Sequence, residues 1–277
     1  MKKLLLFFIL GAFLAFGFSY FKNTAQDIIF PQDQVKGERT VQKLPILRIG
    51  LVADSENDNE NLKRALVQLQ GVGVNFVIGL GDWSNVGTID ELTAVRDIFE
   101  ASKLKYYLTS GDHDLWDSRN RGEQALTNFN KVFGDSSRSF EQNGVDFVLV
   151  DNSDIYKGIG SQGWKDLSDA LNKPAKLQLV FAHKTPFHPD SKHIMGEDTP
   201  EVAKQAENLL NLLQGKKVGG FFSGDLHFFA KFKSPDASVK ITTIGAISAE
   251  RNFQGPRFGV LTIFDDYSWE IEDIEIR

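Results

Sequence analysis

Cysteine is absent from the 277 residues, and methionine occurs only twice. The lack of cysteine excludes disulfides, thiolate metal ligands and a cysteine nucleophile, and it leaves the redox compartment open. Any metal ion in this protein would therefore have to be held by histidine, aspartate, glutamate or asparagine side chains.

Long basic runs are also missing, since 31 Lys and Arg stand against 37 Asp and Glu for a net charge of −6. Nucleic-acid binding needs concentrated positive charge, so we expect no nucleic-acid partner. The chain contains no G-x-S-x-G elbow and no P-loop. The sequence therefore has no motif that would support a serine hydrolase or a P-loop nucleotide triphosphatase. The stretch "GIGSQG" lacks the ribose-binding acid of a dinucleotide site. We expect a monomer.

Only one long hydrophobic run is present, from Leu4 to Phe21 behind two N-terminal lysines. Its length of roughly 18 residues favours a transmembrane anchor over residues 1–22, with a cleaved signal peptide as the alternative. Under both alternatives the lysines keep the N-terminus cytoplasmic, so the rest of the chain is expected outside the cytoplasm, membrane-anchored or secreted. A Gln/Lys-rich linker over 23–43 then leads into one domain over 44–277.

Strand-like and helix-like segments alternate from residue 44 onward. "ILRIGLVAD", "VNFVIGLGD" and "KLKYYLTSGDHD" are apolar runs that end in an acid, and amphipathic stretches separate them. This βαβαβ pattern predicts an α/β fold with parallel strands. The last three strand-like segments have no intervening helix, so we expect antiparallel pairing there.

Polar side chains recur where these strands end, at the sheet edge where α/β proteins bind ligands. Clustered carboxylates raise one another's pKa, and a divalent cation removes that cost. The sequence therefore predicts a metal site. Its candidate residues are Asp54, Glu56, Asp82, Asn85, Asp112, His113, His183, Asp225 and His227.

The order of these blocks resembles the calcineurin-like metallophosphoesterases, whose signature is D-x-H, G-D-x-x-[DN], G-N-H-[DE], a lone His and G-H-x-H. Here the blocks read D-S-E, G-D-W-S-N, G-D-H-D, A-H-K-T-P and G-D-L-H over about 175 residues. The family also tends to have a helix with Gln and then Trp before the lone His, as in "SQGWKDLSDAL". The resemblance implies a four-layer αββα sandwich of two mixed sheets.

The resemblance also implies roles for individual residues. Asp54, Glu56 and His227 would hold a first metal ion, Asp82 would bridge, and Asp112, His183 and Asp225 would hold a second. Two ions about 4 Å apart activate a hydroxide for attack on a phosphate mono- or diester, with no covalent intermediate. His113 would protonate the leaving oxygen, while Asn85, Lys184 and Arg251 are candidate substrate contacts.

Three ligand positions depart from the family pattern. Glu56 and Asp225 stand in place of His, and Asp112 stands in place of Asn. With two divalent ions, the charge of the site falls from about +2 to about −1, which weakens attraction for a phosphate dianion. A trivalent iron, a protonated Asp, or Lys184 and Arg251 would compensate. Oxygen ligands also favour Mn, Fe, Mg or Ca over Zn.

The same departures support an alternative function, a non-catalytic extracytoplasmic domain that binds Ca²⁺ or Mg²⁺. Retention of His113 and His183 favours the enzyme, because a structural Ca²⁺ site has little use for imidazole. Specificity would reside in the segments 114–135 and 186–200, and His188 and His193 in the second are expected in a solvent-exposed loop, with a lid or extra ligand as the alternative.

Overall fold

The computed structural model describes residues 43–277. The anchor or signal predicted over 1–22, and the linker except for Lys43, lie outside the described residues. Within residues 43–277, no helix is both long and apolar enough to cross a membrane.

The first sheet has the strand order β11-β10-β1-β2-β3. Its strands are β1 (Pro45–Val52), β2 (Phe76–Leu80), β3 (Tyr106–Thr109), β10 (Arg257–Phe264) and β11 (Trp269–Glu275). The strands β1, β2 and β3 are parallel, whereas β10 pairs antiparallel with both β1 and β11. The parallel strands are connected through α2 (Asn59–Val72) and α3 (Ile89–Ser102), as the βαβαβ pattern predicted.

The second sheet has the strand order β4-β5-β6-β7-β9-β8. Its strands are β4 (Arg138–Gln142), β5 (Val145–Leu149), β6 (Leu177–Phe181), β7 (Gly220–Ser223), β8 (Ala230–Lys233) and β9 (Lys240–Thr243). The four strands β5, β6, β7 and β9 run parallel, and β4 and β8 are antiparallel at the two edges. The crossover helices are α6 (Ser161–Leu171) and α7 (Pro200–Gly215).

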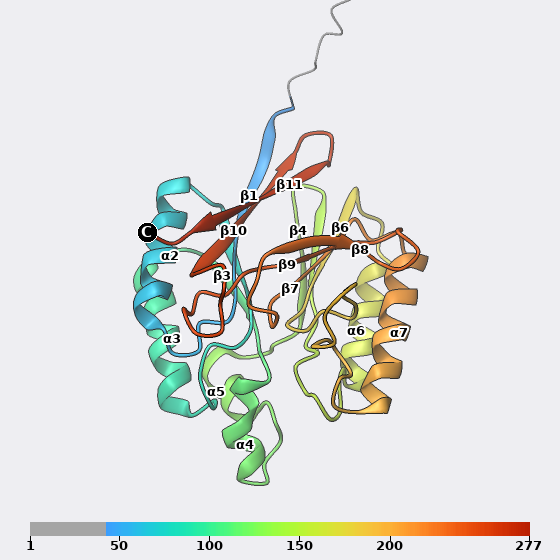
Figure 1. Ribbon diagram of the computed structural model, residues 1–277. Coiled ribbons are helices and arrows are strands. Elements are labelled where there is room, and N and C mark those ends of the chain that lie inside the picture. Colours follow the sequence, from blue (N-terminus) through green and yellow to red (C-terminus); the bar gives the residue numbers. More distant parts are fainter. Residues whose placement is uncertain (1–42) are drawn as a thin grey trace, which may run out of the picture. The chain divides into compact units, whose positions relative to one another are not determined.

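The two sheets pack face to face, with α2 and α3 outside one and α6 and α7 outside the other (Figure 1). Successive side chains of a strand point to opposite faces of its sheet, so one face packs on the other sheet and the opposite face packs on the helices. On β7, Phe222 lies in the core between the sheets, while the neighbouring Phe221 packs with α6 and α7. The predicted four-layer αββα sandwich of two mixed sheets is confirmed.

The helices begin and end where local signals indicate. Thr88 and Glu91 form a capping box at the start of α3, Pro200 opens α7, and Gly73 in a left-handed conformation ends α2. These signals are local, so they are readable without the tertiary structure.

Two details differ from the sequence-based expectation. The strand β9 is antiparallel to β8 but parallel to β7, because β8 folds back as the outer strand and β9 returns between the two. The segment 114–135 also contains helices, namely a 3₁₀ turn (His113–Leu115), α4 (Trp116–Asn120) and α5 (Thr127–Phe133). Phe129 of α5 is buried in the core next to α3.

Candidate metal centre

The predicted ligands converge because the strands that carry them end at the same edge of the sandwich. Ligand atoms lie within 4.8 Å of one another in three groups. We call Glu56, Asp82 and His227 the Glu56 cluster, and Asp112, His183 and Asp225 the Asp112 cluster. Asp54, Asp82 and His183 form the third group and connect the two.

Five of these residues have left-handed backbone conformations. Their φ angles are 52° at Asp54, 42° at Glu56, 55° at Asp82, 65° at Asp225 and 59° at His227. Residues other than glycine seldom adopt this conformation, and it persists where the surrounding structure enforces it, often at functional sites. The strand-end turns therefore hold these side chains so that their ligand atoms converge.

A close approach of two strand ends requires Gly111. A Cβ at this position would lie 2.1 Å from both the backbone nitrogen and Oδ1 of Asp82. Only glycine therefore lets the turn after β3 pass this close to the Asp82 carboxylate.

In the Glu56 cluster, the Glu56 carboxylate is buried among cationic and imidazole groups. Its Oε1 accepts a hydrogen bond from Arg251 and lies 3.7 Å from His227 Nε2. Burial raises the pKa of Glu56, and Arg251 partly counters this. Burial and the nearby Arg251 lower the pKa of His227, which favours the neutral imidazole that a metal ion requires.

In the Asp112 cluster, His183 is fully buried and donates from Nδ1 to the carbonyl oxygen of Leu80 at 2.7 Å. This bond directs Nε2 at the carboxylates, 3.3 Å from Asp112 Oδ1 and 3.5 Å from Asp225 Oδ1. Burial opposes a charge on His183, but the carboxylates, Asp82 foremost, outweigh it and raise its pKa. The position therefore favours a cation.

The Asp112 cluster already contains a cation, the ammonium group of Lys184. Lys184 Nζ lies 2.5 Å from Asp225 Oδ1 and 3.0 Å from Asp112 Oδ1. Burial opposes its charge, yet the two carboxylates, Asp225 first, raise the pKa of Lys184. Burial would raise the pKa of Asp225, but Lys184 and His183 hold it well below its usual range.

His113, the predicted proton donor, lies at the rim of the Glu56 cluster. Its Nδ1 donates to the carbonyl oxygen of Asn85 at 2.9 Å, and its ring stacks on Trp116 with centroids 4.1 Å apart. Its Nε2 lies 3.9 Å from Glu56 Oε1. The backbone nitrogen of His113 also donates to Asp82 Oδ1 at 3.0 Å, which couples the turn to the metal centre.

The remaining candidates lie at different depths. Asn85 is exposed and Arg251 reaches in from an exposed position, whereas Lys184 is buried. His193 is exposed, but its Nε2 lies 3.3 Å from Asp225 Oδ1. His188 instead accepts hydrogen bonds from the backbone of residues 190 and 191 in its own segment.

Two buried residues support the site without having been assigned a role from the sequence. Asp114 accepts hydrogen bonds from the backbone nitrogens of Trp83 and Gly111, and burial beside Asp82 raises its pKa to about 7. Its place in the G-D-H-D block was an available signal. Asn152 binds the backbone of Lys184 with both side-chain atoms, donating at 2.7 Å and accepting at 2.9 Å. No sequence motif marks Asn152.

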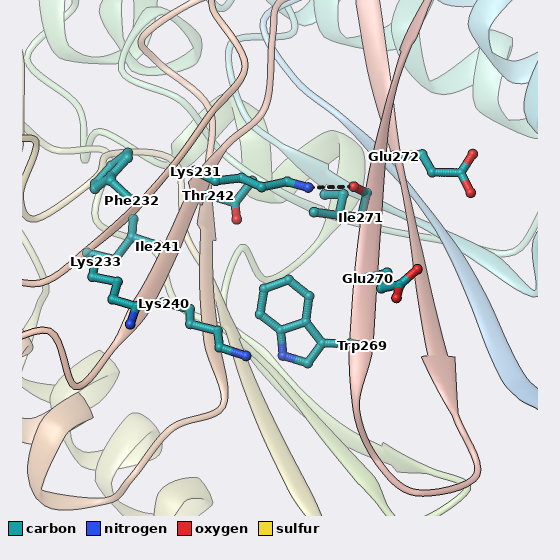
Figure 2. Close-up of a pocket in the computed structure, with 10 residues that line it drawn as sticks. All are labelled: Lys231, Phe232, Lys233, Lys240, Ile241, Thr242, Trp269, Glu270, Ile271 and Glu272. Carbon is teal, nitrogen blue, oxygen red and sulfur yellow. Dashed lines mark hydrogen bonds between the residues drawn. The ribbon is translucent and has the colours of Figure 1, made fainter. Parts of the chain in front are cut away.

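A separate pocket of about 440 Å³ opens between β8 and β9 of one sheet and β11 of the other (Figure 2). Lys231 donates to the carbonyl oxygen of Ile271 at 2.8 Å, and Lys240 lies over the Trp269 ring. The pocket shares no residue with the metal centre.

Residues 47–229 match the family model of calcineurin-like phosphoesterases. No curated protein matches the chain by sequence. The chain belongs to the calcineurin-like phosphoesterase family, whose members are hydrolases that act on phosphoesters.

Solved structures share the fold at low sequence identity. A dimetal phosphatase from Danio rerio has 15% identity and a TM-score of 0.60, covering 84% of this chain and 100% of its own. The purple acid phosphatase PPD1 from yellow lupin has 14% identity and a TM-score of 0.62, covering 83% of this chain and 51% of its own. GAP50, described as the anchor in the inner membrane complex of Plasmodium, has 16% identity and a TM-score of 0.56, covering 83% of this chain and 89% of its own.

The family implies divalent metal ions, and the two clusters fit them unequally. Among the described residues, Glu56 Oε2 is buried without a hydrogen-bond partner, so the Glu56 cluster offers an oxygen beside His227. In the Asp112 cluster, Lys184 contacts one oxygen of each carboxylate, and Asp225 Oδ2 has no hydrogen-bond partner within residues 43–277. The Glu56 cluster therefore fits a divalent ion, whereas the Asp112 cluster holds the ammonium where the family places an ion.

Proposed function

We propose that this protein hydrolyses a phosphate mono- or diester, with a divalent ion held by Asp54, Glu56, Asp82 and His227. The observation that carries the proposal is the juxtaposition of the Glu56 cluster and His113 at one sheet edge. When bound, a divalent ion supplies a Lewis acid for the phosphoryl oxygens and lowers the pKa of water. The acidic ligand set favours Mn, Fe, Mg or Ca over Zn.

His113 would transfer the proton to the leaving oxygen. Its Nδ1 proton is committed to the Asn85 carbonyl, so Nε2 is the atom that faces the site. Stacking on Trp116 holds the ring in that orientation. A positioned acid of this kind typically contributes about 10²–10⁴-fold to the rate.

Turnover of an aryl phosphate monoester and diester by the full-length protein, with each of the four metals, tests this function. His113→Ala should lose turnover while metal content stays unchanged, and Asp82→Asn should lose both. Lys204→Ala is the control, because Lys204 is exposed on α7, outside both segments expected to carry specificity. Unchanged turnover in His113→Ala would reject its role as the proton donor.

One observation favours the second candidate function, a non-catalytic domain that binds Ca²⁺ or Mg²⁺. Each carboxylate that replaces a neutral family ligand is paired with a cationic side chain of the protein, Glu56 with Arg251 and the other two with Lys184. Calcium binding without turnover under any of the four metals would establish this alternative.

We also propose that the domain is held outside the cytoplasm by residues 1–22, which supports a phosphorylated substrate in that compartment. The support is the apolar run behind two lysines. The mass of the mature protein from membranes distinguishes an anchor from a cleaved signal. Recovery of the full-length protein from the cytoplasmic fraction would overturn the proposal.

A further inference from the structure

The ammonium group of Lys184 lies among the atoms that would bind the second metal ion of the family. It contacts Asp225 Oδ1 at 2.5 Å and Asp112 Oδ1 at 3.0 Å. Those two oxygens are also the ones that face His183 Nε2, at 3.5 Å and 3.3 Å. A metal ion bound by these three groups would therefore compete with Lys184 for the same oxygens.

The position of Lys184 is held from two directions. Its side chain is only 5% exposed, so the ammonium cannot turn to water without the segment moving. Asn152, itself fully buried, donates to the Lys184 carbonyl and accepts from its backbone nitrogen. Because both polar atoms of the Lys184 backbone are bound to Asn152, movement of this segment would break buried hydrogen bonds.

The added negative charge of this cluster compensates the charge of the lysine. Asp112 and Asp225 each contribute one negative charge more than the neutral Asn and His of the family pattern, and the lysine is paired with both. His193 approaches Asp225 Oδ1 at 3.3 Å from the same segment. A divalent ion placed beside the ammonium would be repelled at short range in a buried site.

The Glu56 cluster differs from the Asp112 cluster in the solvent exposure of its cation. Its cation, Arg251, has a side chain 62% exposed, so it can return to water when a metal ion binds Glu56. Within residues 43–277, Glu56 Oε2 and Asp225 Oδ2 both lack a hydrogen-bond partner, so the exposure of the cation is what separates the two clusters. This cluster is therefore open to a metal ion, whereas the Asp112 cluster is filled.

We propose that this protein has a mononuclear centre, with one divalent ion in the Glu56 cluster and the Lys184 ammonium as a permanent replacement for the second ion. The phosphate would then be met by one metal ion and one fixed ammonium. This proposal extends the proposed function and depends on it only for the presence of a divalent ion in the Glu56 cluster.

Metal stoichiometry tests the proposal without any measurement of activity. The full-length protein is stripped with chelator, titrated with Mn²⁺ by calorimetry, and examined by electron paramagnetic resonance. We expect one Mn²⁺ per chain with the spectrum of an isolated ion. Lys184→Ala should bind two, with the spectrum of a coupled pair. Lys192→Ala, which removes an exposed lysine of the same segment, should bind one.

Two ions in the unaltered protein, or none, would overturn the proposal, as would a single ion in folded Lys184→Ala. If Lys184→Ala does not fold, the double variant Lys184→Ala/Asp112→Asn removes one unpaired charge and restores the Asn of the family pattern. It should bind two ions, and its melting temperature should rise further with Mn²⁺ than that of the unaltered protein. One bound ion without turnover would overturn the proposed function and leave the mononuclear centre standing.

Discussion

The two halves of the metal centre neutralise their carboxylates in different ways. In the Asp112 cluster the cation is Lys184, with a side chain 5% exposed, whereas in the Glu56 cluster it is Arg251, with a side chain 62% exposed. Removing one partner of an ion pair costs much where both partners are buried and less where one of them is exposed to solvent. The difference teaches that an extra carboxylate can either reserve a site for a protein cation or leave it available to a metal ion.

The largest effect is expected from Asp82→Asn, because Asp82 contributes to both halves through the group that connects them. The change keeps the side-chain shape and removes the charge. Mutating a residue that only supports a metal ligand lowers metal affinity or activity by about 10–100-fold. Because Asp82 is itself a predicted ligand, we expect Asp82→Asn to lower the turnover of an aryl phosphate by at least about 100-fold. Asp169→Asn in α6 is the matched control. Retained turnover in Asp82→Asn would show that neither half uses this carboxylate.

A direct comparison of the halves comes from Lys184→Ala and Arg251→Ala in metal-free protein. We expect Lys184→Ala to lower the free energy of unfolding by about 3–5 kcal/mol, because it leaves buried carboxylates unpaired. Arg251→Ala should cost less, because the 62% exposed Arg251 side chain is screened by solvent although Glu56 itself is buried. Chemical denaturation measures both changes. Equal losses in the two variants would remove the distinction between the halves.

A smaller effect is expected when the support of Lys184 is removed instead of Lys184 itself. Asn152→Ala leaves the backbone N–H and C=O of Lys184 without their partners. A buried group without a partner costs about 1–3 kcal/mol, and denaturation should show a loss of this order. Ionised Asp in Asn152→Asp keeps the acceptor but has no donor, whereas protonated Asp regains an O–H donor. The loss of stability in Asn152→Asp should therefore be smaller at low pH than at neutral pH. No loss in Asn152→Ala would mean that Lys184 holds its position unaided.

The smallest effect concerns pH at a position beside the centre. Burial raises the pKa of Asp151, and hydrogen bonds from Ser153 and Ser110 partly oppose this. Because its folded pKa lies above the unfolded value, the stabilisation is complete below the unfolded pKa and is lost as pH rises through the folded pKa. Asp151→Asn does not titrate, so its stability relative to the unaltered protein should increase from pH 4 to pH 7. A pH-independent difference between the two proteins would contradict this assignment.

Much of the fold was predictable because its signals are local. The apolar runs ending in acids predicted β1, β2 and β3, and the capping box formed by Thr88 and Glu91 is a local signal for the start of α3. The pairing of β9 with β7 was not predictable, because strand order depends on how the chain folds back through β8. The short helices α4 and α5 were also missed, since each has only a few residues of periodic pattern.

The sequence by itself determined the family and the chemistry of the ligands, because residue types at strand ends are written directly in the motifs. Only the tertiary structure decided how the acidic ligands are neutralised. Lys184 follows His183 in the chain, and nothing local indicates that its ammonium lies between Asp112 and Asp225, which come from two other strand ends. Electrostatic partners are chosen by distance in space and by burial, and both depend on the packing of the whole sandwich.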